Sequence, residues 1–253
     1  MSGQVIIIYL IENSIKMKNN KFVTGAFLIC IAMAACTNYG KEKTYNAMEL
    51  YRTDKVTEAE SDLLGNYLIK EKFADGKVKT IQLAKNDNVY QVRFVVDGDK
   101  ARDAEYAKAA KFLGTMISSQ LFNGAPVEVD LCDDHLNTKS VLIADDFGTR
   151  KIFNGVEIFH SKNIRTTEVD SLGNYLVRSG FADGNAKSVQ ITKSSIAYQF
   201  KFVVNKGVDK DTAYLKNGRV FAAEMSKLVF SDKPVEVILC DAYFSPLVTV
   251  QMK

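Results

Sequence analysis

Cys132, Asp133, Asp134 and His135 are consecutive, and their side chains are of types that could do chemistry. A thiol beside an imidazole can act as a nucleophile, and thiolate, imidazole and carboxylate groups are all ligands of zinc. Neighbours at the end of a strand point in opposing directions, however, whereas zinc needs three or four ligands spread around it. A thiol or metal-assisted hydrolase using Cys132 and His135 is therefore the alternative hypothesis. No metal or other cofactor is expected.

A second candidate site is a set of polar side chains that alternate with apolar ones along predicted strands. Alternation directs them to the sheet face opposite the core. Arg93 and Lys201 lie between carboxylates on this face, which suits binding of a partner. The alternative is that cross-strand pairs stabilise an exposed sheet by roughly 0.3 kcal/mol each. The predicted binding residues are Glu49, Gln91, Arg93 and Glu128 in one half of the chain, and Glu157, Gln199, Lys201 and Glu236 in the other.

These two sets are related by an internal repeat with an offset of 108 residues. The segment GNYL at 65–68 recurs at 173–176, FADG at 73–76 recurs at 181–184, and PVEV at 126–129 recurs at 234–237. Between Glu60 and Asp133, 31 of 74 aligned positions are identical without a gap. A duplication of this kind predicts two similar domains, at residues 42–148 and 149–253.

Both copies predict the same order of elements. In the first copy, residues 48–51 alternate as a strand. Residues 57–73 begin with a capping-box pattern and end before Asp75-Gly76, which predicts a helix. An extended segment is the alternative there, because Gly65 weakens a helix by about 1 kcal/mol. Residues 78–83 and 89–96 predict a hairpin, apolar residues at helical spacing from Tyr106 to Leu121 predict a second helix, and residues 127–131 predict a last strand.

The resulting βαββαβ order predicts an α+β class with two tandem ferredoxin-like domains, each with two helices on one face of a four-stranded sheet. Gly65 and Gly173 are expected to let a helix approach the sheet closely. The side chains expected to face the helices in the first copy are Leu50, Ile81, Leu83, Tyr90, Val92, Phe94, Val129 and Leu131. Gln82 and Cys132, with Gln190 and Cys240 in the second copy, are expected on the opposite face.

Cys132 and Cys240 occupy equivalent strand positions in the two copies. In an oxidising compartment they could form a disulfide. Duplication alone would also place two cysteines symmetrically without any contact, and small buried cysteines are common. Both interpretations stay open at this point.

Composition disfavours nucleic acid as a partner. The chain has a formal charge of +3, and the positive excess comes largely from its first 35 residues, because the remainder carries 30 basic and 29 acidic side chains. Affinity for DNA or RNA depends on neutralising many phosphates, so no nucleic-acid partner is expected. The chain also lacks the motifs of P-loop, G-x-S-x-G and H-E-x-x-H enzymes. We therefore expect a protein that is not an enzyme.

The amino-terminal segment predicts an address. From Met17, Lys18 and Lys21 form a positive n-region, residues 22–33 form an apolar h-region, and Ala34-Ala35 precede Cys36. This is the form of a secretory signal peptide at residues 17–35, and it is too short to span a membrane comfortably. Residues 1–16 carry their own apolar run ahead of the n-region, so we interpret them as a gene-model extension. Residues 36–41 are expected to form a polar tether.

The cysteine at the cleavage point makes this segment resemble the lipobox of bacterial lipoproteins. The resemblance implies lipidation of Cys36, a lipid-anchored location in the cell envelope on the periplasmic or outer-membrane side, and membrane attachment through that lipid. The whole pattern is similar to tandem-domain lipoproteins of Bacteroidetes-type envelopes, which imply a location but no activity. The leading functional hypothesis is a non-enzymatic binding module whose two sheet faces take a protein or glycan partner. A purely structural envelope component is a further alternative.

Overall fold

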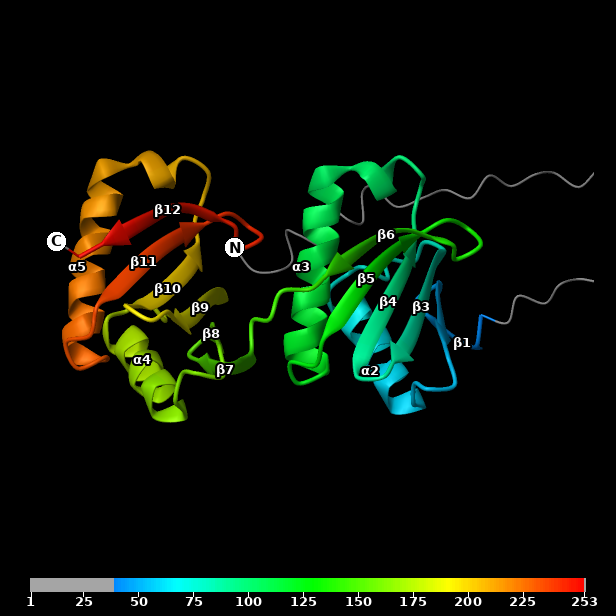
Figure 1. The fold of residues 1–253 in the computed structure, drawn as a ribbon, viewed down its shortest axis with the longest axis horizontal. Helices are drawn as coiled ribbons and strands as arrows, with labels where there is room; N and C mark the ends of the chain where they lie inside the picture. Colours follow the sequence, from blue (N-terminus) through cyan, green and yellow to red (C-terminus); the bar gives the residue numbers. More distant parts are fainter. Residues whose placement is uncertain (1–38, 253) are drawn as a thin grey trace, which may run out of the picture.

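The computed structural model describes residues 39–252, which form two α+β domains (Figure 1). The bounds of the elements of the first domain are β1 Lys41–Tyr45, β2 Met48–Arg52, α2 Glu58–Lys70, β3 Lys79–Asn86, β4 Val89–Val95, η1 Lys100–Arg102, α3 Ala104–Leu121, β5 Val127–Cys132 and β6 Thr138–Ile143. Those of the second are β7 Thr149–Phe153, β8 Val156–His160, α4 Thr166–Arg178, β9 Lys187–Lys193, β10 Tyr198–Val203, η2 Val208–Lys210, α5 Thr212–Leu228, β11 Val235–Cys240 and β12 Pro246–Gln251. The signal segment, with Cys36, Thr37 and Asn38 of the expected tether, lies outside the described residues.

Each domain has one six-stranded sheet whose strands follow the order of the chain, from β1 to β6 and from β7 to β12. The predicted α+β class and the βαββαβ order are confirmed, with one further strand at each edge. Within that core, β2 pairs in parallel with β3, and β4 pairs in parallel with β5. Each helix therefore connects two adjacent parallel strands. A split βαβ unit, the arrangement expected of a ferredoxin-like sheet, would instead place another strand between them.

The helices begin and approach the sheet as their sequences predict. Thr57 and Glu60 form a complete capping box at the start of α2. A Cβ atom placed on Gly65 would lie 2.4 Å from the Tyr45 ring, and one on Gly173 would lie 2.4 Å from the ring of Phe153. Glycine thus lets the first helix of each domain lie directly on the edge hairpin. The expected extended alternative for residues 57–73 is excluded.

The first helix ends earlier than predicted. α2 stops at Lys70, three residues before Phe73, and Lys72 is left-handed with φ of 63°. The equivalent residue in the second domain is Gly180, with φ of 75°. The left-handed residue ends the helix because it turns the backbone out of the helical path. Gly76 therefore lies in the following loop. There, Lys79 donates a hydrogen bond to the Phe73 carbonyl and pairs with Asp75 at 2.5 Å.

The core of each domain lies between its helices and its sheet. The eight side chains expected to face the helices in the first copy are all buried. Tyr39 and Gly40, at the end of the expected tether, already belong to the first domain: the Tyr39 carbonyl accepts a hydrogen bond from Gln82 at 2.7 Å. No helix among residues 39–252 is long and apolar enough to cross a membrane.

The two domains stack in the same orientation. Figure 1 shows α4 and α5 on the outer side of the second sheet, and α3 between the second sheet and the first. The chain therefore forms alternating layers of helices and sheet, in which helices of the first domain face the second sheet. The outer face of the first sheet ends the stack on one side, and α4 and α5 end it on the other.

Candidate binding face

An aromatic cluster joins the two domains. Phe112 of α3 stacks on Phe244 with ring centroids 6.0 Å apart, and meets Phe147 edge-on at 6.1 Å. Phe147 in turn meets Phe159 of β8 at 5.7 Å and Phe244 at 5.2 Å. Tyr243 also contacts Phe112, and Val203 and Ala242 pack against the same cluster. Part of the sheet face of the second domain is thus a docking surface, occupied by a helix of the first domain.

The first domain keeps the equivalent surface. An offset of 108 residues maps Phe147 and Phe159 onto Tyr39 and Tyr51, and these two rings meet edge-on at 5.8 Å, as their counterparts do. Leu136 stands where the second domain has Phe244, and it is also buried. Figure 1 shows no helix of residues 39–252 over this face. We call this surface the first-domain face. It comprises Tyr39, Tyr51 and Leu136 together with the predicted polar residues of the first sheet, which are Glu49, Gln91, Arg93 and Glu128.

The predicted polar residues lie on the sheet faces as expected, and several are tied to their neighbours. Gln91 donates a hydrogen bond to Glu128 at 3.1 Å, and Gln199 donates one to Glu236 at 2.9 Å. Glu49 accepts from Thr80, and Glu157 accepts from Ser188 and pairs with Arg150 at 2.6 Å. These matching cross-strand bonds account for part of the retention of polar residues in both copies.

Arg93 is the centre of a network on the first-domain face. Its guanidinium donates to Gln82 at 2.5 Å and to the Leu136 carbonyl at 2.6 Å, and its Nε lies 3.4 Å from Asp130. Thr138 also donates to Asp130. Burial raises the pKa of the Asp130 carboxyl, and the hydrogen bond from Thr138 and the charge of Arg93 oppose this. Arg93 thereby fixes the loop of residues 133–138 over one end of the face.

The second copy does not reproduce this network. Ile238 replaces Asp130, Pro246 replaces Thr138, and Lys201 replaces Arg93. The Lys201 side chain makes no hydrogen bond or ion pair with any described residue. The two faces therefore share a position in the fold but differ in chemistry: the first is polar and held by Arg93, and the second is apolar where α3 docks.

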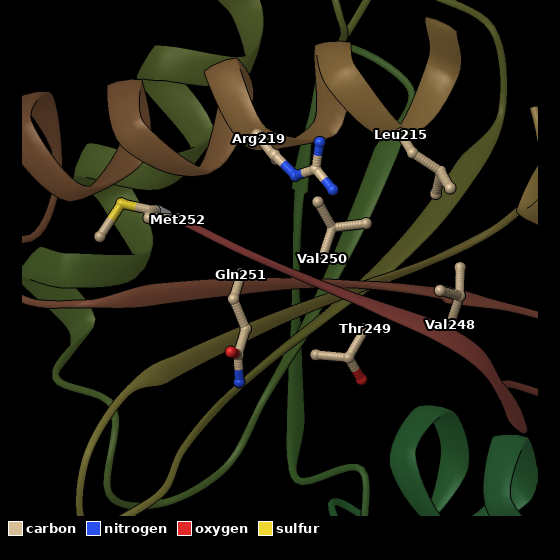
Figure 2. Close-up of a pocket in the computed structure, with 7 residues that line it drawn as sticks. All are labelled: Leu215, Arg219, Val248, Thr249, Val250, Gln251 and Met252. Carbon is tan, nitrogen blue, oxygen red and sulfur yellow. The ribbon is translucent and has the colours of Figure 1, made fainter. Parts of the chain in front are cut away.

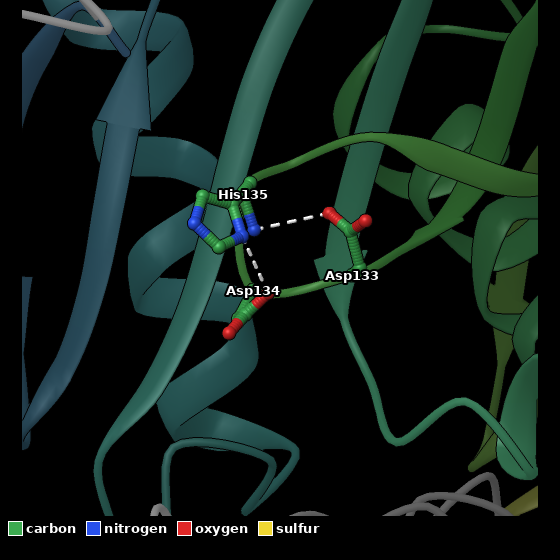
Figure 3. Close-up of side chains that lie close together, drawn as sticks. All are labelled: Asp133, Asp134 and His135. Carbon is green, nitrogen blue, oxygen red and sulfur yellow. Dashed lines mark hydrogen bonds and ion pairs between the residues drawn. The ribbon is translucent and has the colours of Figure 1, made fainter. Parts of the chain in front are cut away.

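The Asp133–His135 cluster is a turn in which the side chains of Asp134 and His135 are exposed and that of Asp133 is half-buried (Figure 3). Asp133 accepts hydrogen bonds from the backbone N–H groups of His135 and Asn137, at 3.0 and 2.8 Å. Asp241 accepts the same two bonds in the second copy, from Tyr243 and Ser245. The aspartate therefore has a structural function that both copies share. Asp133, Asp134 and His135 offer ligand atoms within 4.8 Å of one another, but among the described residues the His135 ring bonds only to Asp134, and the His135 side chain is 71% exposed.

Cys132 and Cys240 are free, buried and in separate sheets. The disulfide considered above is therefore absent from the structure. Burial raises the pKa of the Cys132 thiol, and raises that of Cys240 to about 12. A thiol with a raised pKa holds little thiolate at neutral pH, and thiolate is the nucleophilic form.

Sequence reasoning did not identify the aromatic members of these surfaces. The predicted binding residues are charged and glutamine side chains of the strands, and they do not include Tyr39, Tyr51, Phe112 or Phe147. The repeat carried the signal that could have found them, because it pairs Tyr39 with Phe147 and Tyr51 with Phe159 at equal spacing.

Fold and surface together define a tandem-repeat protein of two docked α+β domains. A family model described as the AF_1994_N family N-terminal domain matches residues 43–143 and again residues 151–252. Because the matches span most of the chain, the chain belongs to this family and carries its domain twice. No curated protein and no solved structure matches the chain.

Proposed function

We propose that the protein is an envelope-anchored lipoprotein that acts as a non-enzymatic interaction module through the first-domain face. One observation carries the proposal: the equivalent surface of the second domain binds a helix of the first domain through Phe147, Phe159 and Phe244. The first domain keeps the ring pair of that surface in Tyr39 and Tyr51, with no helix on it. A protein that presents a helix with an apolar anchor is the partner that this precedent favours.

A lipid on Cys36 would hold this face close to a membrane. Only Thr37 and Asn38 separate Cys36 from Tyr39, and three residues span at most about 10 Å. The partner would then act at the membrane surface. The hydrolase alternative has less support, because the Cys132 thiol is buried and its pKa is raised.

The interaction is tested by capture of partners on the immobilised fragment from Thr37 onward, which holds both described domains. Tyr51→Asp and Glu128→Lys are expected to lose partners that the unchanged fragment retains. Glu236→Lys, the matched change on the second domain, and Ile196→Asp, at an exposed position in a distant turn, are expected to keep them. If all four variants capture the same proteins, the first-domain face is not the binding surface.

The anchor is tested separately in bacteria grown with labelled palmitate. Full-length chain should incorporate label, Cys36→Ser should not, and Cys30→Ser, in the same segment, should. Intact mass of the processed protein should show that residues 1–35 are removed. A labelled Cys36→Ser variant would contradict lipidation while leaving the interaction open to its own test.

A further inference from the structure

A pocket of about 540 Å³ lies on the second domain, between α5 and β12 (Figure 2). Leu215 and Arg219 extend into it from α5, and the β12 side contributes Val248, Thr249, Val250, Gln251 and Met252. Its volume is within the range of ligand sites. It is not part of the first-domain face, because its lining belongs entirely to the second domain.

The lining shows that the pocket follows the outer edge of the sheet. Figure 2 shows Val248 and Val250 directed toward α5, and Thr249 and Gln251 directed the other way. Side chains from both faces of the sheet can line the same pocket only if the pocket runs along the edge of β12. β12 is the last strand of its sheet and pairs only with β11, so its outer edge presents backbone N–H and C=O groups.

The first domain shows what pairs with the cation at the equivalent position of its second helix. There the chain continues beyond β6, and Asp145 pairs with Lys111 of α3 at 2.7 Å while its N–H donates to Thr115. Arg219 is the counterpart of Lys111. The counterpart of Asp145 is Lys253, whose side chain is a cation and which lies outside the described residues. No hydrogen bond or ion pair joins the Arg219 side chain to another described residue.

From these features we propose that this pocket binds an extended peptide, which adds to the edge of β12 as a further strand and places a carboxylate on Arg219. Backbone hydrogen bonds to the strand edge supply affinity in this mode of recognition, and side-chain pockets supply specificity. Leu215, Val248 and Met252 select apolar side chains at alternate positions of the peptide. The carboxylate belongs either to an acidic side chain or to the peptide's own carboxyl terminus.

The test is selection of random heptapeptides with a free carboxyl terminus, displayed on phage, against the immobilised fragment from Thr37 onward. Enriched peptides are expected to bind in fluorescence polarisation, and Arg219→Gln should weaken them about tenfold, equivalent to about 1.4 kcal/mol. Arg219→Lys should retain part of the affinity. Lys111→Gln, the matched change in the first domain, should leave it unchanged. An amidated peptide distinguishes a terminal carboxylate from one on a side chain.

Hydrogen exchange supplies a readout of the binding mode. Bound peptide should slow exchange of amides in β12 and leave those of β6 unaffected. No enrichment of peptides, enriched peptides that bind equally to Arg219→Gln, or protection outside β12 would each overturn the proposal. None of these outcomes bears on the first-domain face, which lies on the other domain.

Discussion

Glu60 and Glu168 occupy the same position in the two copies, and each has two functions. Each accepts a hydrogen bond from the backbone N–H of the residue that precedes its helix, Thr57 or Arg165, and another from a tyrosine hydroxyl of the sheet, Tyr90 or Tyr198. Burial raises the pKa of Glu168, but the hydrogen bonds from Arg165 and Tyr198 outweigh it and lower the pKa to about 2. One carboxylate thus holds the start of a helix to the sheet in each domain.

The lowered pKa predicts a specific loss of stability in acid. A carboxylate whose folded pKa is about 2 and whose unfolded pKa is near 4.5 stabilises the fold fully above pH 4.5, and this contribution is lost as pH falls toward 2. We expect that part of the stability change in this window, on the order of 2 kcal/mol, depends on Glu168. Urea unfolding at a series of pH values measures it. Glu168→Gln should flatten the profile between pH 4.5 and 2, and an unchanged profile would contradict the assignment.

A second prediction at the scale of the residue concerns glycines in helices. Gly65→Ala places a Cβ 2.4 Å from the buried Tyr45 ring, so we expect a loss of about 1–3 kcal/mol from overpacking. Gly218→Ala is the control, because its nearest neighbour, Val250, would be 3.6 Å away. Alanine there should raise stability by up to about 1 kcal/mol through helix propensity. Chemical denaturation compares the two variants, and equal effects would show that close approach does not explain Gly65.

At the scale of the element, the turns after β5 and β11 depend on one aspartate each. Asp133→Ala removes the acceptor of two backbone N–H groups, and we expect a loss of about 1–2 kcal/mol, as for a helix cap. Asp134→Ala, at the adjacent position, should change stability by less than about 0.5 kcal/mol because its side chain is 72% exposed and bonds only to His135. Thermal unfolding distinguishes them. A larger effect at Asp134 would instead indicate a function for the exposed cluster.

Elements could be predicted from the sequence because each is specified locally. The capping box at Thr57 and Glu60, the period-two pattern of β4 and the helical spacing in α3 are properties of a few adjacent residues. The edge strands β1 and β6 lack this signal. Both are largely exposed, and neither shows apolar, buried side chains alternating with polar, exposed ones. The end of α2 was placed too late because Lys72 gives no sign in the sequence that it is left-handed.

The candidate site was less predictable for a related reason. The polar residues of the sheet faces could be found, because alternation assigns a face to every strand residue. Which face is free depends on how the domains dock. Docking depends on Phe112, in a helix of the first domain, and on Phe147, in the segment between β6 and β7, and neither lies in a strand whose alternation would assign it a face. A repeat specifies two equivalent surfaces, and only the packing of one copy on the other distinguishes them.

At the scale of the whole molecule, the two ends of the stack differ from its interior. The outer surface of α3 carries Ala109, Phe112 and Met116, which are buried, whereas α5 has Asn217, Val220 and Glu224 at the equivalent positions, which are exposed. Repeat proteins characteristically have polar outer faces on their terminal repeats. Within residues 39–252, α3 is therefore an internal layer and α5 lies on an outer face.

Phe112 should therefore couple the stability of the two domains. It is 7% exposed and contacts Phe147, Tyr243 and Phe244 across the junction. Removing its ring leaves a cavity between the domains, and Phe→Ala changes at buried sites cost about 3–5 kcal/mol. Because the ring lies at the junction of the two domains, its removal should mainly weaken the contact between the domains. Calorimetry of Phe112→Ala is expected to resolve two unfolding transitions where the unchanged protein shows one.

Val220→Ala is the matched control for this experiment. Val220 is the counterpart of Phe112 in the second copy, but it is 54% exposed and faces no other domain. Its removal should shift stability by less than about 0.5 kcal/mol and leave a single transition. Two transitions in the unchanged protein would mean that the domains unfold independently despite the aromatic cluster. The second sheet face would then be only transiently covered, and Gln199, Lys201 and Glu236 would be as accessible to a partner as the first-domain face.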